Sequence, residues 1–300
     1  MWHRHHGGVP VGVVDVGSNT VRLLVTDAGR EVLSLRERLR LGEEVERYGL
    51  IRPHKLAELA DCVGDFADAA RHEGTEALEV LVTSPGRQAT NGSELRRHLS
   101  AVAQAPVRLL SAHEEGRLAF VGALGSTRVP ARKPAAVVDV GGGSAQLVLG
   151  TRRDGPSWSR SIDVGSLRLT SRCLPGDPPG REAIRTARGE VAQLLEGIEP
   201  PSAAAAYAVG GSARALRRLF GSRLGRDELK AAVELLAVTP GADLAAEYGI
   251  STARAATLPA GAVILEALQR RLDTPLKVAR SGLRHGALLE LAERAAARAA

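Results

Sequence analysis

Residues 13–25 read VVDVGSNTVRLLV, and residues 137–149 repeat the pattern as VVDVGGGSAQLVL. In both copies an apolar run ends in an aspartate (Asp15 or Asp139), a turn of small residues follows, and a second apolar run begins. This order predicts a strand, a tight turn and a second strand, which is a β-hairpin with an acidic group at its mouth. Because the pattern occurs twice, we expect two related half-molecules.

The composition of these turns favours an anionic ligand. Glycine and other small residues let backbone N–H groups approach an anion closely. An aspartate beside a bound phosphate needs a cation between the two negative charges. We therefore expect the two hairpins to face one cleft that holds a metal-bound phosphate substrate. The aspartates could instead only cap their own turns, although the duplication argues for function.

Length and composition indicate a two-domain globular protein. The 300 residues suit two domains of about 150 residues each. Only 3% of residues are aromatic, so Val, Leu, Ile and Ala must build the cores. We find no apolar stretch long enough to span a membrane and no signal-peptide pattern at the N-terminus. Cys62 and Cys173 form no disulfide framework, so a reducing cytoplasm is the simplest compartment.

The chain is basic, with 40 Lys and Arg against 34 Asp and Glu and a formal charge of +6. Such an excess favours a polyanionic partner, although a solvated Arg-rich surface is the alternative. The scarcity of aromatics disfavours binding to single-stranded nucleic acid.

Periodicity predicts alternating strands and helices, so the fold class is α/β. Besides the hairpins, we expect strands at residues 31–41, 78–82, 107–110, 159–164, 204–209 and 276–279. We expect helices at residues 54–73, 92–104, 111–124, 181–195, 227–238 and 260–272, one starting at 213, and one at the C-terminal end. Residues 42–49 and 173–180 read as loops. Ser111 with Glu114 three residues later is a capping-box pattern.

The segment Gly125–Pro134 contains Gly, Ser, Thr, two Pro and three basic residues and is the best candidate for a linker. It divides the chain into an N-terminal domain of residues 1–125 and a C-terminal domain of residues 126–300. The last helix belongs to the second domain or packs back on the first.

Six segments, in this order, resemble the Ppx/GppA family of exopolyphosphatases and guanosine pentaphosphate phosphohydrolases. They are VDVGSNTVRL (14–23), TSPGRQATN (83–91), EEGRLAF (114–120), VDVGGGS (138–144), VGGSAR (209–214) and SGLRHG (281–286). The resemblance spans roughly residues 10 to 290. It implies two actin-like (ribonuclease H-like) domains of the actin/Hsp70/sugar-kinase superfamily with a cleft between them. The chain looks like the short form, which lacks a C-terminal HD-type domain.

The resemblance implies roles for three carboxylates. Glu115 matches the family's catalytic glutamate and is expected to orient the attacking water or act as a general base. Nearby phosphates are expected to raise its pKa. The alternative, an exposed acid favoured by the helix dipole, suits Glu114 better. Asp139 and Asp15 are the expected ligands of Mg²⁺ or Mn²⁺, with Asp139 the stronger candidate.

Phosphate contacts are expected from three glycine-containing turns and from Arg87, whose planar fork suits phosphate oxygens. The turn residues are Gly17, Ser18, Asn19, Thr20, Gly141, Gly142, Gly143, Ser144, Gly210, Gly211 and Ser212. The last three precede a helix, whose N-terminus favours anions. A purely structural turn is the alternative for the three consecutive glycines.

Two departures from the family pattern stand out. Pro85-Gly86 occupies positions where bulkier apolar residues are common, so the loop that carries Arg87 could be set differently. Gln146 stands where the family often has Glu, which could weaken or relocate a metal. Arg284 is expected either to bind substrate or to hold a domain contact, and Arg22 to face a neighbouring strand or the surface. The terminal histidines are expected to belong to a frayed end: His3, His5 and His6.

These features predict a metal-dependent exopolyphosphatase that hydrolyses the terminal phosphoanhydride of inorganic polyphosphate and releases orthophosphate. The nearest alternative is hydrolysis of the 5′-γ-phosphate of guanosine pentaphosphate, because both substrates end in a phosphoanhydride. A polyphosphate-forming phosphotransferase and a non-catalytic regulator that binds polyphosphate or guanosine tetraphosphate are further alternatives. The family implies a homodimer, and nucleic acid is the least favoured partner.

Overall fold

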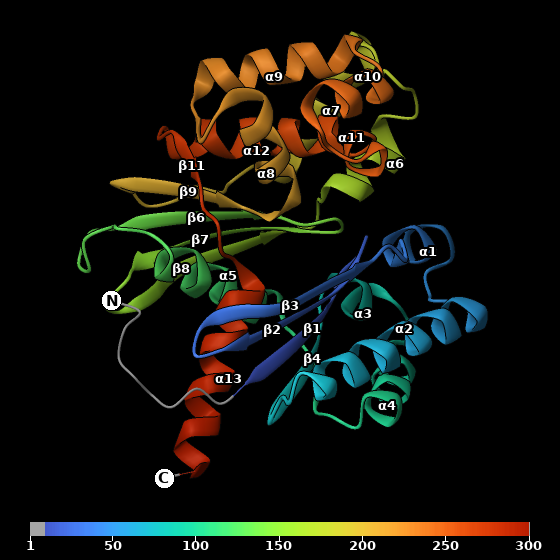
Figure 1. Ribbon diagram of the computed structural model, residues 1–300. Helices are drawn as coiled ribbons and strands as arrows, with labels where there is room; N and C mark the ends of the chain where they lie inside the picture. Colours follow the sequence, from blue (N-terminus) through green and yellow to red (C-terminus); the bar gives the residue numbers. More distant parts are fainter. Residues whose placement is uncertain (1–9, 300) are drawn as a thin grey trace. The chain divides into compact units, whose positions relative to one another are not determined.

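The computed structural model describes residues 10–299, which pack into two compact units (Figure 1). The first unit holds the described residues up to Glu114 and resumes at Arg284, and the second unit runs from Glu115 to Leu283. The three terminal histidines lie outside the described residues. Within residues 10–299 there is no helix whose length and apolar character would let it span a membrane.

The first unit is built on a five-stranded sheet with strand order β3-β2-β1-β4-β5. Its first three strands form an antiparallel meander, and the other two run parallel to β1. The strands are β1 (Val11–Val16), β2 (Val21–Asp27), β3 (Arg30–Glu37), β4 (Ala77–Val82) and β5 (Val107–Leu109). The helices are α1 (Leu41–Tyr48), α2 (Pro53–His72), α3 (Ser84–Gln88), α4 (Gly92–Ala103) and the C-terminal α13 (Leu283–Ala299). The apolar faces of α2 and α4 and the inward residues of β1 and β2 share one hydrophobic core.

The second unit has a six-stranded sheet with strand order β10-β11-β9-β6-β7-β8. Its strands are β6 (Ala135–Val140), β7 (Ala145–Thr151), β8 (Gly155–Ile162), β9 (Ala205–Val209), β10 (Arg223–Leu224) and β11 (Leu276–Val278). Its helices are α5 (Ala112–Gly125), α6 (Ser166–Cys173), α7 (Arg181–Leu194), α8 (Gly210–Phe220), α9 (Arg226–Val238), α10 (Gly241–Tyr248), α11 (Thr252–Ala255) and α12 (Leu258–Leu272).

Strand residues alternate between two cores in the second unit, because successive side chains point to opposite faces of a sheet. Val138 and Leu147 belong to the main core, which also contains α12 and the helices stacked around it (Figure 1). Val137 and Val148 belong to a smaller core, in which they meet Phe120 of α5. The sheet is therefore covered on both faces, which explains why its central strands are nearly all apolar.

The sequence repeat is also a structural repeat. Asp15 pairs with Arg22 across β1 and β2, and Asp139 pairs with Gln146 across β6 and β7, one position before the end of the first strand in each case. Each of these first strands also pairs in parallel with the next core strand, β4 or β9. The predicted α/β class with two units is confirmed. The cleft expected between them stays a prediction.

Some local predictions are wrong. Residues 42–49, read as a loop, form most of helix α1, where Leu41 and Val45 are buried one turn apart and Gly49 ends the helix at φ 70°. Residues 84–88 form the short helix α3 where only a strand end was expected. Helix α8 begins at Gly210, earlier than position 213. Helices this short owe their stability to tertiary packing, which a local pattern does not show.

The predicted boundary after residue 125 differs from the division of the folded chain. Helix α5 packs through Ala119, Phe120 and Ala123 on the second sheet, so residues from Glu115 onward group with the second unit. The predicted linker at 125–134 therefore lies inside that unit. Helix α13 groups with the first unit from Arg284, as the sequence analysis allowed for the last helix.

Candidate active site

The turn between β1 and β2 directs the backbone N–H groups of Asn19 and Thr20 away from helix α1. The Gly17 amide donates to the Thr20 carbonyl over 3.1 Å and closes the turn. Amides at the start of α1 bind its other carbonyls: Gly42 N–H donates to Ser18 O (2.7 Å), and Arg40 N–H donates to Asn19 O (3.2 Å). In a trans peptide the carbonyl and the following N–H point in opposite directions. The N–H groups of Asn19 and Thr20 therefore point away from α1.

The turn between β6 and β7 has the same construction. Gly141 N–H donates to Ser144 O over 3.0 Å. Here the first turn of α6 takes the place of α1, because Ser166 N–H donates to Gly141 O and Leu167 N–H donates to Gly142 O, both over 2.9 Å. By the same peptide geometry, the N–H groups of Gly142 and Gly143 point away from α6.

Gly165 makes this contact with α6 possible. A Cβ atom built on Gly165 would lie well under 3 Å from the backbone of Gly142, closer than real Cβ atoms come. The φ of Gly165 is −135°, which any residue can adopt, so the requirement is purely one of space. The glycines at 141–143 do not have a left-handed φ either. The close approach in this turn is between Gly165 and Gly142, whereas the approach of an anion to Gly141–Gly143 stays a prediction.

Both turns can therefore donate backbone hydrogen bonds to phosphate oxygens. A helix behind each turn binds the carbonyls, so the donors are fixed before any anion arrives. Helix α6 was not predicted from the sequence, and neither was the contribution of α1. That Gly17–Thr20 and Gly141–Ser144 bind phosphate stays a prediction.

Asp15 lies beside two arginines. The Nε atom of Arg284, at the start of α13, is 4.0 Å from Asp15 Oδ2. Arg22, its partner across the hairpin, donates from Nε to Thr20 Oγ1 over 3.2 Å. Burial raises the pKa of the Asp15 carboxyl, and the positive charges of Arg284 and Arg22 partly offset this effect. A proton would therefore compete with a cation for Asp15 more effectively than for an exposed aspartate.

Asp139 lies against the N-terminus of α8. A Cβ atom built on Gly210 would be 3.0 Å from Asp139 Oδ1 and 2.9 Å from the Val140 carbonyl oxygen, and Gly210 has a φ of +94°. Gly210–Ser212 thus forms the first turn of the helix and not a loop before it. The guanidinium of Arg254 lies directly over Gly211 and donates from Nη1 to Thr257 Oγ1 over 3.4 Å. Sequence reasoning missed Arg254, which stands in no recognisable motif.

Glu115 is buried in the first turn of α5, with 7% of its surface exposed. The next residue of α5, Gly116, packs against β7, since a Cβ atom at Gly116 would be 2.8 Å from Val148 and 3.5 Å from Gln146. Gln146 is also buried, and its Nε2 donates to Ser144 Oγ over 2.9 Å. Its Oε1 has no hydrogen-bond partner among the described residues. The start of α5 therefore packs on the strand that leads out of the Gly141–Ser144 turn.

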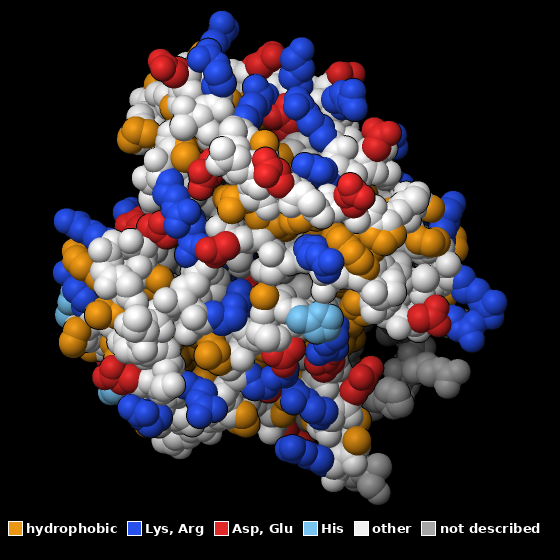
Figure 2. Space-filling model, turned by 180° about the vertical axis from the view of Figure 1, so that it is seen from behind, with side chains coloured by type: hydrophobic (Ala, Val, Ile, Leu, Met, Phe, Trp, Pro, Cys, Tyr) orange, Lys and Arg blue, Asp and Glu red, His pale blue; other side chains and the backbone are white. Residues whose placement is uncertain are grey.

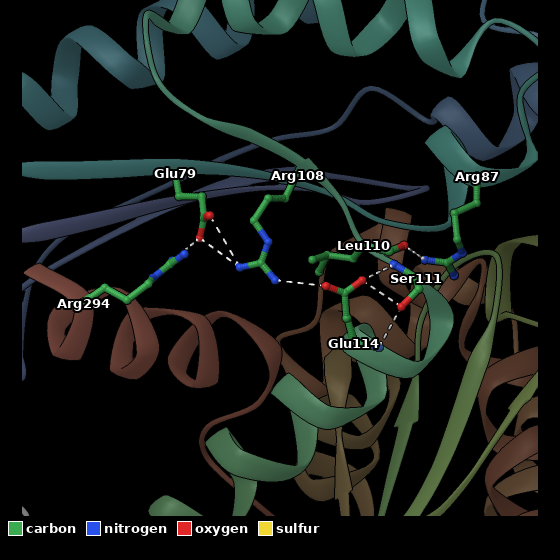
Figure 3. A network of polar contacts seen from close by, with 7 residues as sticks. All are labelled: Glu79, Arg87, Arg108, Leu110, Ser111, Glu114 and Arg294. Atoms are coloured by element: carbon green, nitrogen blue, oxygen red, sulfur yellow. Dashed lines mark hydrogen bonds and ion pairs between the residues drawn. The ribbon is translucent and has the colours of Figure 1, made fainter.

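Arg87 lies on α3 in the first unit and donates from Nη1 to the Leu110 carbonyl over 2.8 Å. Leu110 precedes Ser111, the residue that caps α5 (Figure 3). The predicted capping box is present: Ser111 N–H donates to Glu114 Oε2 over 2.8 Å, and Glu114 N–H donates to Ser111 Oγ over 3.2 Å. The Arg87 side chain thus contacts the segment that leads into the helix of Glu115.

The predicted site residues divide between the units. The first unit brings together Asp15, Gly17–Thr20 and Arg284 and also carries Arg87. The second unit holds Glu115, Asp139, Gly141–Ser144 and Gly210–Ser212. Within residues 10–299, no three His, Cys, Asp or Glu side chains gather closely enough to hold a metal ion by themselves. The metal-binding roles of Asp15 and Asp139 stay predictions.

Similarity to known proteins extends over most of the chain. The model of the Ppx/GppA phosphatase family matches residues 25–295. Exopolyphosphatase 2 of Mycobacterium tuberculosis is 31% identical over 294 residues, which cover 87% of this chain and 90% of that protein. Exopolyphosphatase 1 of the same organism is 30% identical and covers 93% of this chain and 87% of that protein.

Solved structures share the fold. A protein described as exopolyphosphatase-like superposes with a TM-score of 0.85 at 23% identity, covering 96% of this chain and 100% of the other. The Aquifex aeolicus member of the Ppx/GppA family superposes with a TM-score of 0.81 at 21% identity, covering 96% and 99%.

Proposed function

We propose, from the premise that this chain belongs to the Ppx/GppA phosphatase family, that it is an exopolyphosphatase. In this reaction a water molecule attacks the terminal phosphorus of inorganic polyphosphate, the bond to the bridging oxygen breaks, and orthophosphate leaves. The observation that carries the proposal is the pair of matched turns, in which the first turns of α1 and α6 hold the carbonyls away from the ligand. Such fixed donors suit the several oxygens of a polyphosphate chain.

Glu115 is the residue that would act on the water. Its carboxylate is buried in the first turn of a helix that packs on β7, so the side chain has little freedom to reorient. A carboxylate in this setting can accept a hydrogen bond from the water and align it for in-line attack. Arg87 and Arg254 would bind phosphate oxygens through their planar guanidinium groups.

The site residues fit a hard divalent cation. Asp139 directs a carboxylate oxygen toward the first turn of α8, and Asp15 keeps 20% of its side chain exposed. Mg²⁺ and Mn²⁺ prefer such oxygen ligands and complete their coordination with water and phosphate oxygens. When bound, the ion would neutralise negative charge on the transferring phosphoryl group. The residues that would hold it are Asp139 and Asp15.

A basic surface is consistent with a long polyanionic substrate. Figure 2 shows many Lys and Arg side chains on one face, interspersed with Asp and Glu. The excess of six positive charges supports the same view. We also propose a homodimer in the cytoplasm; the two cysteines, Cys62 and Cys173, are free thiols, which suits a reducing compartment.

The test is phosphate release from long-chain polyphosphate with Mg²⁺, with Mn²⁺ and with a chelator. The wild type should release phosphate only with metal, and Glu115→Ala should lower kcat by about 100-fold or more. Glu234→Ala is the matched control, because that glutamate is 61% exposed on α9. Equal rates for the wild type and Glu115→Ala would remove Glu115 from the mechanism.

The same assay separates the alternative functions. Faster release from guanosine pentaphosphate than from polyphosphate would identify the nucleotide as the substrate. Turnover that requires a nucleotide acceptor would indicate a phosphotransferase. Tight binding of polyphosphate or guanosine tetraphosphate without phosphate release under any metal would indicate a regulator. Retention of DNA or RNA in the presence of short polyphosphate would indicate a nucleic-acid-binding protein.

A further inference from the structure

A buried carboxylate outside the predicted site holds two arginines (Figure 3). Glu79 lies on β4 with 3% of its side chain exposed. Arg294 of α13 donates from Nη2 to Glu79 Oε2 over 2.8 Å. Arg108 of β5 donates from Nη1 to both Glu79 oxygens over 3.4 Å. None of these three residues belongs to the motifs described above.

Arg108 extends this contact to the start of α5. Its second terminal nitrogen, Nη2, donates to Glu114 Oε1 over 3.2 Å. The other oxygen of Glu114 accepts hydrogen bonds from the Ser111 amide (2.8 Å) and the Ser111 hydroxyl (2.7 Å). The chain of contacts therefore runs from α13 through β4 and β5 to the capping box. The residue after Glu114 is Glu115.

The chemistry of Arg108 makes this a rigid connection. A guanidinium is planar, and its two terminal nitrogens here bind two different carboxylates. Arg108 therefore links Glu114 to Glu79, in addition to the contacts that Glu114 makes with Ser111. Stability alone does not require such an arrangement, because apolar residues in place of a buried ion pair are often as stable. Precise placement of a neighbouring group is a use that an apolar replacement would not supply.

We propose that Glu79 and Arg108 are positioning residues that fix the first turn of α5 and thereby the carboxylate of Glu115. This inference rests on the proposed function for its kinetic consequence, but its structural consequence does not depend on the substrate. A shift of the α5 start would misalign the attacking water without altering the turns that bind phosphate. The loss should therefore fall on kcat and leave KM unchanged.

The experiment compares Glu79→Gln and Arg108→Lys with Glu266→Gln. Glu266 is the matched control because it too is a buried carboxylate, 4% exposed, held by two arginines, Arg188 and Arg270. It lies on α12, whose apolar residues belong to the main core of the second unit and not to the smaller core that contains α5. We expect kcat for polyphosphate to fall about 10-fold in the two test variants, with KM within about 2-fold of the wild type. The Glu266→Gln variant should lose a similar amount of thermal stability with kcat unchanged.

Hydrogen–deuterium exchange supplies a readout that needs no substrate. Amides of the first turn of α5 should exchange faster in Glu79→Gln and Arg108→Lys than in the wild type or Glu266→Gln. Unchanged exchange in that turn, or an unchanged kcat beside an inactive Glu115→Ala, would overturn the positioning role. A fully active Glu115→Ala would instead overturn the catalytic assignment of Glu115. Arg108 is 28% exposed, so Arg108→Lys provides a folded test protein even if Glu79→Gln does not fold.

Discussion

Gly165 takes no part in chemistry, yet the placement of a predicted phosphate-binding turn depends on it. It lets the first amides of α6 reach the carbonyls of Gly141 and Gly142. Any side chain at this position would displace either the turn or the helix. The backbone of Gly165 is in an ordinary extended conformation, so a substitution tests only the space that the side chain needs.

We expect Gly165→Ala to be destabilised by about 1–3 kcal/mol, because the added methyl group must displace the backbone of Gly142. The rate of phosphate release should also fall, since the backbone N–H groups of Gly142 and Gly143 would be displaced. Thermal unfolding and steady-state kinetics check both effects.

Gly189→Ala is the control for this prediction. Gly189 lies within α7, and a Cβ atom there would meet open space. Alanine at this position should therefore raise the free energy of unfolding by about 0.5–1 kcal/mol. A Gly165→Ala variant as stable and active as Gly189→Ala would show that the contact between turn and helix is dispensable.

At the scale of residues, the sequence identified the groups that a motif carries and missed those that only the fold brings in. Asp15 and Asp139 were predicted as site residues because the repeat places each aspartate at the end of an apolar run. Arg254 was missed because it reaches Gly211 from a segment more than forty positions later in the chain. The contact of Arg284 with Asp15 joins opposite ends of the chain, and no local pattern encodes it.

At the scale of elements, the start of helix α5 could be predicted from the residues of its first turn. Ser111 and Glu114 form the predicted capping box, and Arg108 adds a contact to the same carboxylate. Hydrogen bonds from the Ser111 amide and hydroxyl, with a smaller contribution from Arg108, hold the pKa of Glu114 below its ordinary value of 4.5. The ionised form of Glu114 is therefore the one that stabilises the fold.

This pKa predicts a pH-dependent effect of Glu114→Gln. A lowered folded-state pKa contributes stability above the unfolded-state value of about 4.5, and that stability is lost as the pH falls through the folded-state pKa. The variant should unfold more easily than the wild type at pH 7, by about 1 kcal/mol or less because the Glu114 side chain is 39% exposed.

The difference in unfolding temperature should close as the pH is lowered below about 4.5. Thermal unfolding of both proteins from pH 7 to pH 3 measures it. A difference that stays constant over this range would mean that Glu114 acts through packing and not through its charge.

The accuracy of the sequence-based predictions differed between long and short elements. Strands and long helices followed the predictions closely, because their apolar period continues over several turns or strand pairs. Helix α1 was read as a loop because its short sequence has two charged residues in the first turn and only two buried apolar positions. It forms because Leu41 and Val45 join the core of the first unit, a contact that the sequence of the helix does not reveal.

At the scale of the whole molecule, the repeated hairpin was enough to predict two α/β units, but not where the chain divides. The Gly- and Pro-containing segment at 125–134 looked like a linker on composition alone. The folded chain places α5 with the second sheet, because Phe120 and its neighbours pack on Val137 and Val148. The division thus depends on contacts between distant segments.

Limited trypsin digestion tests this division. Arg128 and Arg132 are exposed in the segment before β6, whereas the bond between Lys133 and Pro134 resists trypsin. Cleavage after either arginine should give two fragments that separate in denaturant but stay together in native size-exclusion chromatography. They should remain associated because α5 packs on β6 and β7 and because α13 packs with the first unit.

A double variant, Arg128→Gln with Arg132→Gln, should stay intact under the same digestion and serves as the control. Separation of the two fragments under native conditions would place the boundary at 125–134 after all.

The discontinuous first unit has a consequence for synthesis on the ribosome. Its sheet emerges early, but Arg294, the partner of Glu79 on α13, emerges only after the whole second unit has been made. The second unit is continuous in sequence, so its core does not depend on the segment that is made last. The part of the protein that leaves the ribosome first is therefore the last to be finished.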